Sequence, residues 1–251
     1  LSKLSQGFAT DLAKDAHGKR LLGTRTDGFV AGSTLKRPEL GKTLRTFAKY
    51  GATPFYTGAI ADSIIASTGH HGGILQKKDF ASYQIKKRTP LSANAFGYQW
   101  VSSPPPSAGG YILLSSLSLL ERWSKGQEHP YTWWLHAFAE SLKGPFIDRA
   151  AYFGDPDFVN VPLERLFSAE RMARRAKIFN PNRAVNPNQY ALPLQPAAQN
   201  KAYAKTGGGT THLCVVDKEG NVAAVTTTIN LPFGSRITAD GMFLNNQMDD
   251  F

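Results

Sequence analysis

The sequence predicts an α/β protein in which the first 200 residues are mostly helical and are followed by a β-hairpin. Apolar residues recur at helical spacing in several segments before residue 180. Near the end of the chain, two short β-rich runs over 213–216 and 222–229 flank a turn. The composition is that of a globular protein, since 41% of the 251 residues are hydrophobic and 19% are charged.

The helical segments follow one another along the first 180 residues. After a helix and a polar loop within 1–32, we expect helices over residues 38–47, 58–67, 78–83, 111–123, 132–152 and 168–179. Pro38 suits the first turn of its helix, and Gly51 suits the position just past the end. Between them Leu40, Leu44 and Phe47 form an apolar stripe.

Extended structure interrupts this series around residue 100. We expect residues 84–89 to be extended and residues 98–101 to form a strand, which the prolines at 104–106 break. Gly109 and Gly110 then open a helix. A glycine-rich helix start can bind an anion. The lysine of a phosphate-binding loop is absent here, so close helix packing is the favoured interpretation.

Residues 180–209 are rich in Asn, Pro, Gln, Ala and Gly and show little periodicity, so we expect a mobile surface segment there. The formal net charge is +10, which raises the possibility of a nucleic-acid partner. The basic residues are scattered, however, and the densest run, 171–177, lies on a predicted amphipathic helix. We therefore interpret them as solvated faces and expect no nucleic-acid partner.

Metal and disulfide chemistry find little support in the sequence. Cys214 is the only cysteine, which excludes an intrachain disulfide and a cysteine zinc site, and we expect it to pack. His70 and His71 have no third ligand nearby, which favours a polar turn. The amides and carboxylates of 245–250 could hold an ammonium group or form a solvated end, but they lack the spacing of a calcium loop. No metal or cofactor is expected.

The turn between the two β-rich runs fixes their pairing. Asp217 and Gly220 suit a type I turn with a G1 bulge, which pairs Asp217 with Asn221. In that register Thr210 lies opposite Thr228, and Asn230 falls two residues beyond on the same face. A different loop length would shift the pairing. Ordinary β-propensity alone would also account for the threonines of the second run.

The run Gly207–Gly209 stands directly before Thr210 and Thr211. A threonine hydroxyl is a poor nucleophile unless a base lies beside it, and a threonine at a chain terminus carries a base in its own α-amine. A cut after Gly209 would create such a terminus. Glycines suit the strained backbone that such a cut needs. A loop that leads into a strand is the plain alternative.

The following stretches occur together in one known family, in this order: Arg88–Leu91, Pro104–Gly110, Phe153–Phe158, Thr210–His212, Val215–Asp217, Gly220–Asn221, Thr226–Asn230, Phe233–Gly234 and Asn245–Phe251. Through them the chain resembles the γ-glutamyltranspeptidases, also called γ-glutamyltransferases, of the N-terminal-nucleophile hydrolase superfamily. The resemblance covers nearly the whole chain. The order and spacing of the stretches make it specific.

The resemblance implies part of a four-layer αββα sandwich and an inactive precursor that cleaves itself into a large and a small subunit. The cut would fall between Gly209 and Thr210. Residues 1–209 would then end the large subunit, and residues 210–251 would begin the small one. Thr210 would be the nucleophile of self-cleavage and, once freed, of catalysis.

The resemblance also implies roles for four further residues. Thr228 would orient Thr210 through a hydrogen bond. Asn230, Gln247 and Asp250 would bind the α-amino group of a γ-glutamyl substrate such as glutathione. The acyl group would pass to water or to an acceptor amino acid or peptide, without a cofactor. The family resemblance further implies a protein located outside the cytoplasm, which this sequence does not itself indicate.

The chain begins at Leu1, without a methionine, and stops at Phe251, whereas precursors of this family are longer at both ends. An arginine for the α-carboxylate, and serines and glycines for the same group and the oxyanion, would lie outside it. We therefore expect this segment alone to be inactive. Two alternatives remain: a β-lactam or glutaryl acylase, whose acyl group carries no amine, and a non-catalytic basic binding module that has lost activity.

Overall fold

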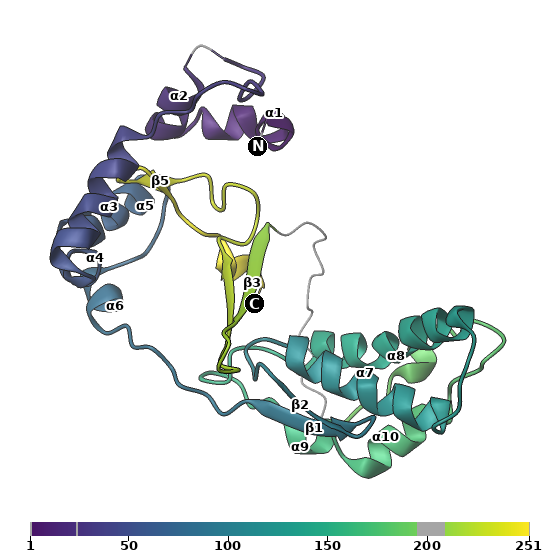
Figure 1. Cartoon of the computed structure of the whole chain (residues 1–251). Coiled ribbons are helices and arrows are strands. Elements are labelled where there is room, and N and C mark those ends of the chain that lie inside the picture. Colours follow the sequence, from purple (N-terminus) through teal and green to yellow (C-terminus); the bar gives the residue numbers. More distant parts are fainter. Residues whose placement is uncertain (1, 24, 195–208, 251) are drawn as a thin grey trace. The chain divides into compact units, whose positions relative to one another are not determined.

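The structure is a computed structural model that describes residues 2–23, 25–194 and 209–250, and its mixture of helices and strands confirms the α/β class (Figure 1). The chain divides into two compact units. Unit 1 combines residues 1–85 with 205–249, and unit 2 consists mainly of residues 86–204.

Unit 1 contains six helices and two small hairpins within its described residues, and a short 3-10 helix ends the chain. The elements are α1 (Ser2–Leu12), α2 (Ala16–Leu22), α3 (Pro38–Tyr50), α4 (Thr53–Tyr56), α5 (Ala59–Gly69), α6 (Lys77–Ala81), β3 (Thr210–Val216), β4 (Val222–Thr228), β5 (Thr238–Ala239), β6 (Met242–Phe243) and η2 (Gln247–Asp250). β3 pairs with β4, and β5 pairs with β6, both antiparallel. The predicted helices at 38–47, 58–67 and 78–83 are confirmed, including the stop at Gly51.

The segment that follows β4 is anchored in the core of unit 1 at two places. Phe233 is buried in an apolar cluster with Leu12 and Leu22 from α1 and α2. Ala239 is buried against Ile60 and Ile64 of α5. Because these contacts join the two ends of the sequence, helices near the N-terminus fix the path of the chain just beyond the hairpin.

A carboxylate ties α2 to strand β5. Asp15 caps the start of α2, where its Oδ1 accepts from the backbone N–H of His17 at 3.0 Å and of Gly18 at 2.9 Å. The same carboxylate accepts from the Thr238 hydroxyl at 2.5 Å and from the Thr238 N–H at 3.3 Å. Burial alone would raise the pKa of Asp15, but these hydrogen bonds outweigh it and hold the pKa below its usual value.

Unit 2 packs two long helices beside a hairpin. Its elements are β1 (Leu91–Ala95), β2 (Tyr98–Ser102), α7 (Gly109–Ser124), α8 (Tyr131–Tyr152), α9 (Leu163–Leu166), α10 (Ala169–Ala176) and η1 (Pro187–Tyr190). The predicted strand at 98–101 is confirmed. Its partner β1 was missed, because the sequence LSANA has no β-branched or aromatic residue and Leu91 is its one large apolar side chain. A Cβ at Gly110 would overlap the Ser103 carbonyl, so this glycine serves close packing at the start of α7.

An ionic cluster of Tyr111, Asp148, Arg171 and Arg175 lies buried among these helices. Asp148 accepts from Arg171 at 2.5 Å and from Arg175 at 2.8 Å, and the Tyr111 hydroxyl donates to the same carboxylate. Burial and the neighbouring carboxylate raise the pKa of Tyr111. The prediction that the 171–177 run is solvated is therefore wrong for Arg171 and Arg175. Glu170 and Arg174 of the same helix remain exposed.

Within the first half of the predicted mobile segment, two side chains are anchored in unit 2. Residues 181–184 and 186–189 are exposed, but Val185 and the Tyr190 side chain in η1 are buried. Its hydroxyl donates to Glu140 at 2.8 Å, and the Val185 N–H donates to the same carboxylate at 3.3 Å. Residues 195–208 lie outside the described residues. Among those described, no helix is long and apolar enough to cross a membrane.

Candidate active site

The β3–β4 hairpin places the predicted nucleophile opposite its predicted partner. The register pairs Thr210 with Thr228, as the turn chemistry predicted. The Thr210 hydroxyl donates to Thr228 Oγ1 at 3.1 Å. At the other end, Asp217 accepts from the N–H of Asn221 at 2.8 Å, and Gly220 has a φ of 84°. These are the contacts of the predicted bulged turn, so local chemistry at the turn sets the position of Thr210 about seven residues away.

The Thr228 hydroxyl accepts a second hydrogen bond, from the loop that follows β4. The Asn230 N–H donates to Thr228 Oγ1 at 2.8 Å. Thr228 Oγ1 therefore accepts from both Thr210 and Asn230, which restricts the rotation of its side chain. This pair of hydrogen bonds links the candidate nucleophile to the loop that carries the candidate amide.

Asn230 lies in a turn and not on an extended strand. β4 ends at Thr228, and Asn230 has a φ of 70°, in the left-handed region that asparagine tolerates better than most residues. The alternation of the strand therefore does not extend to Asn230, contrary to the register argument. The Gly209 N–H nonetheless donates to the Asn230 carbonyl at 2.8 Å, so the loop stays beside the residue that precedes Thr210.

Gly209 does not have a positive φ. A Cβ built at this position would lie 3.6 Å from the Asn230 oxygen, which is ordinary van der Waals contact. The structure therefore shows no backbone strain at Gly209 itself. The glycines at 207 and 208 lie outside the described residues.

The chain beyond Asn230 is strained and closely packed. Phe233, Gly234 and Arg236 have φ values of 62°, 55° and 64°. A Cβ at Gly234 would overlap the Leu244 carbonyl, so only glycine fits there. Positive φ at a bulky residue such as Phe233 costs energy, which burial of its ring offsets. The loop after β4 is thus held in one conformation beside Thr228.

The predicted residues Gln247 and Asp250 both lie in η2. Asn245 accepts from the Gln247 N–H at 2.9 Å and so begins this short helix. The preceding Asn246 carbonyl accepts from Asn230 Nδ2 at 3.2 Å. The structure thus brings Thr210, Thr228 and Asn230 together and places the start of η2 against Asn230. The side chain of Asp250 lies outside what the structure describes.

Two further polar side chains accompany Thr210 on the same face of the hairpin. His212 Nδ1 lies 2.7 Å from Thr226 Oγ1, and His212 Nε2 lies 3.2 Å from Cys214 Sγ. The prediction that Cys214 packs is wrong in the described chain, where its side chain is exposed. All residues of β3 and β4 are exposed, so in the described part of the chain neither face of this hairpin is covered.

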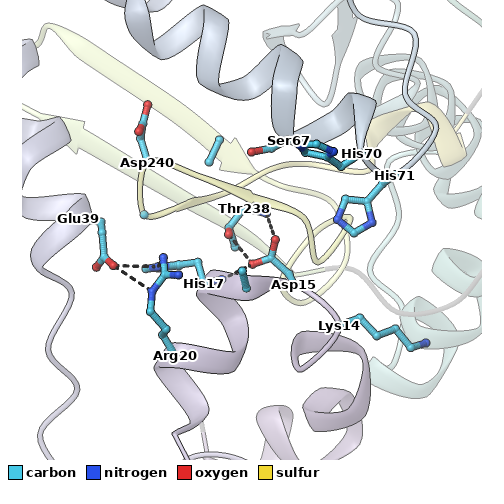
Figure 2. A pocket seen from close by; sticks show the side chains of 13 residues that line it. Lys14, Asp15, His17, Arg20, Glu39, Ser67, His70, His71, Thr238 and Asp240 are labelled. Atoms are coloured by element: carbon cyan, nitrogen blue, oxygen red, sulfur yellow. Dashed lines mark hydrogen bonds and ion pairs between the residues drawn. The ribbon is translucent and has the colours of Figure 1, made fainter.

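A separate hollow of about 460 Å³ opens in unit 1, and Thr210 does not line it (Figure 2). Asp15 is engaged there with Thr238, and Glu39 contacts both Arg20 at 3.3 Å and His17 at 3.5 Å. His70 and His71 lie at its edge, in an exposed turn. Among the described residues no group of histidines, cysteines and carboxylates is arranged to hold a metal ion. The charged groups of this hollow serve mainly to join elements of unit 1.

The chain is similar to known proteins over nearly its whole length. The family model described as gamma-glutamyltranspeptidase matches residues 2–251. The chain is 39% identical over 245 residues to the glutathione hydrolase proenzyme of Escherichia coli strain K12, covering 96% of this chain and 41% of that protein. The chain thus spans about two fifths of the length of such relatives.

Two further relatives bear on the alternatives. The chain is 31% identical over 257 residues to the acylase ACY 1 proenzyme of Pseudomonas sp. strain SE83, covering 100% of this chain and 44% of that protein. The structure of gamma-glutamyltranspeptidase from Pseudomonas nitroreducens, complexed with L-DON, matches with a TM-score of 0.62 and 32% identity. That match covers 73% of this chain and 54% of the other.

Proposed function

The chain belongs to the gamma-glutamyltranspeptidase family, and from that premise we propose that the whole protein is a γ-glutamyltransferase and glutathione hydrolase. The observation that carries the proposal is the hydroxyl pair of Thr210 and Thr228, located where Gly209 joins strand β3. A threonine hydroxyl that directly follows the bond to be cut can become an N-terminal nucleophile. The acylase relative shares this requirement, so the substrate needs a separate argument.

Self-cleavage is the first step of the proposal. Thr210 Oγ attacks the carbonyl carbon of Gly209, and the bond from that carbon to the Thr210 nitrogen breaks. The nitrogen takes up the hydroxyl proton and becomes a free α-amine, while Gly209 is joined to Oγ as an ester. Water then hydrolyses the ester, which leaves a carboxylate on Gly209 and restores the Thr210 hydroxyl. Support comes from the Asn230 carbonyl, which holds the Gly209 N–H beside this bond.

Catalysis reuses the same hydroxyl with the new amine as its base. The α-amine of Thr210 takes the hydroxyl proton, and Oγ attacks the γ-carbonyl of glutathione or another γ-glutamyl amide. The amine passes the proton to the leaving nitrogen, and a γ-glutamyl ester of Thr210 remains. Water releases glutamate from this ester, whereas an acceptor amino acid or peptide takes over the γ-glutamyl group. Thr228 keeps the attacking hydroxyl oriented through both steps.

The amides and the carboxylate that follow β4 in the sequence support a substrate that carries an ammonium group. We assign the binding of the substrate α-amine to Asn230, Gln247 and Asp250. Charge-assisted hydrogen bonds from an ammonium to such oxygens are stronger than neutral ones. An acyl group without an amine gains nothing from this set. The γ-glutamyl group is therefore favoured over the glutaryl group of an acylase substrate.

A pair of alanine variants of the whole protein tests the nucleophile. Thr210→Ala should abolish both self-cleavage, seen as two fragments on a denaturing gel, and release of p-nitroaniline from γ-glutamyl-p-nitroanilide. Thr211→Ala is the matched control, because Thr211 is the neighbouring threonine and lies on the other face of β3. The Thr211→Ala variant should still cleave itself and still release p-nitroaniline. Cleavage by the Thr210 variant would assign the nucleophile to a different residue.

The two alternatives predict different results with the wild-type protein. An acylase would release p-nitroaniline from glutaryl-p-nitroanilide at least as fast as from the γ-glutamyl compound, which differs only by its α-amino group. A non-catalytic binding module would remain a single uncut chain. Fragments together with a strong preference for the γ-glutamyl compound would exclude both alternatives.

A further inference from the structure

Asn246 connects the two segments to which we assign ammonium binding. Its backbone N–H donates to the Ile229 carbonyl at 3.3 Å, and its carbonyl accepts from Asn230 Nδ2 at 3.2 Å. Its side chain bridges in the same way: Oδ1 accepts from the Leu231 N–H at 3.1 Å, and Nδ2 donates to Asp249 Oδ2 at 2.7 Å. One residue thus joins the loop after β4 to helix η2.

These contacts decide which end of the Asn230 amide is available. A backbone carbonyl can only accept, so the end of the Asn230 side chain that meets the Asn246 carbonyl is the NH₂ group. Oδ1 is then the end that remains to accept from an ammonium group. With the amide reversed, an NH₂ group would face the ammonium, and two donors would meet.

The Asn246 side chain also supports the backbone that carries Asn230. Asn230 has a φ of 70°, and the next N–H, that of Leu231, is held by Asn246 Oδ1. An unusual backbone conformation persists when its surroundings fix it, and here the fixing group lies just before η2. The Leu231 N–H and the Asp249 carboxylate require an acceptor and a donor from the same side chain, which an amide supplies.

We propose that Asn246 is a positioning residue for the γ-glutamyl substrate: it presents Asn230 Oδ1 to the α-ammonium group and holds η2 in register with it. This inference rests on the proposed function. Asn246 does not touch the reacting atoms, so its loss should weaken substrate binding more than it slows the chemical step.

Exchanging the partners of one hydrogen bond tests the proposal in the whole protein. In Asn246→Asp the new carboxylate still accepts from Leu231 but faces the carboxylate of Asp249. KM for γ-glutamyl-p-nitroanilide should rise about 10- to 100-fold, the range for a lost hydrogen bond to a charged group, while kcat changes less than about threefold. In the double variant Asn246→Asp, Asp249→Asn, the amide at 249 can donate to the carboxylate at 246. KM should return to within about threefold of that of Asp249→Asn alone.

The outcomes separate this proposal from the proposed function. If the wild type does not turn over the γ-glutamyl compound, the proposed function fails. If the wild type is active and Asn246→Asp keeps the wild-type KM, or the double variant does not recover, the positioning role is overturned. Should Asn246→Asp fail to fold, Asp249→Ala removes the partner of Nδ2 and leaves Asn246 in place. That variant should raise KM about 3- to 10-fold, and an unchanged KM overturns the proposal.

Discussion

The ionic cluster of unit 2 and the Thr210 hairpin of unit 1 both gather polar side chains, but in opposite environments. Asp148 and its two arginines are buried, and each is held by several hydrogen bonds. Thr210 and Thr228 are exposed and share one hydrogen bond between their side chains. Removing one member of a buried ion pair leaves an uncompensated charge in the core, whereas an exposed hydroxyl next to a single partner is open to a substrate.

The comparison predicts that the two regions fail in different ways when a single polar group is removed. Loss of a group from the ionic cluster should lower the free energy of unfolding and leave the chemistry of the remaining folded molecules intact. Loss of a group from the hairpin should slow the chemistry and leave the free energy of unfolding nearly unchanged. The first of the four changes that follow concerns catalysis, and the three that concern stability run from the largest expected effect to the smallest.

Thr228→Val removes the hydroxyl that accepts from Thr210 and keeps the shape of the side chain. We expect self-cleavage and turnover of the γ-glutamyl compound to fall about 10- to 100-fold, the effect of one hydrogen bond to a reacting group. The thermal midpoint should stay close to that of wild type, because residue 228 is exposed. Thr228→Ser keeps a hydroxyl and is the control. Equal loss in both variants would argue against a role for the hydroxyl.

Asp148→Asn leaves two buried guanidinium groups without their carboxylate. Removing one partner of a buried pair costs about 3–5 kcal/mol, so we expect a loss of that order in the free energy of unfolding, measured by urea denaturation of the whole protein. The control Asp157→Asn breaks a surface pair with Arg88 at 2.9 Å and should change stability little. Similar losses in the two variants would contradict the contrast between buried and exposed groups.

The sequence predicts local features of unit 1 well. Turn residues at 217–221 determine the register of the hairpin, and apolar spacing together with Pro38 and Gly51 determines helix α3, because each depends on neighbours in the chain. The α/β class follows from the same local patterns. These are the interactions that a single sequence displays directly.

The sequence does not display the contacts that join distant segments. Arg171 and Arg175 look like solvated residues of a basic helix until Asp148, on another helix, is placed beside them. Asn246 is likewise part of a polar run, and its bridging role emerges only when Ile229–Leu231 lies against it. Paired asparagines directly before a short acidic helix are the one local signal that could have indicated such a role.

Gly144→Ala tests how closely α8 approaches the ionic cluster. A Cβ at residue 144 would overlap the guanidinium group of Arg175. Overpacking of this kind costs about 1–3 kcal/mol, partly offset by the better helix propensity of alanine. Gly7→Ala is the matched control, since Gly7 also lies within a helix and a Cβ there meets nothing within 4 Å. It should stabilise the protein slightly. A stabilising Gly144 variant would show that Arg175 can move aside.

Asp15→Asn tests a buried carboxylate in unit 1, where the expected effect is smallest. Oδ1 of Asp15 accepts from α2 and from the Thr238 hydroxyl, while Oδ2 accepts from the Thr238 N–H. An amide can replace only one of these oxygens, and loss of a cap costs about 0.5–2 kcal/mol. The pKa of Asp15 is lower in the folded state than in the unfolded state. The ionised carboxylate therefore contributes fully to the free energy of unfolding above its unfolded pKa, and this contribution is lost as the pH falls through its folded pKa.

The difference in unfolding free energy between wild type and Asp15→Asn should therefore be constant from pH 7 to about pH 5 and narrow below about pH 4. Urea denaturation of both proteins across this range measures it. Asp62→Asn, which loses an exposed pair with Lys77, should show almost no difference at any pH. A difference that grows toward acid pH would mean that Asp15 is already protonated in the folded protein. Asp15 would then have a raised pKa, which is typical of carboxylates in functional sites and not of one that joins two elements of the fold.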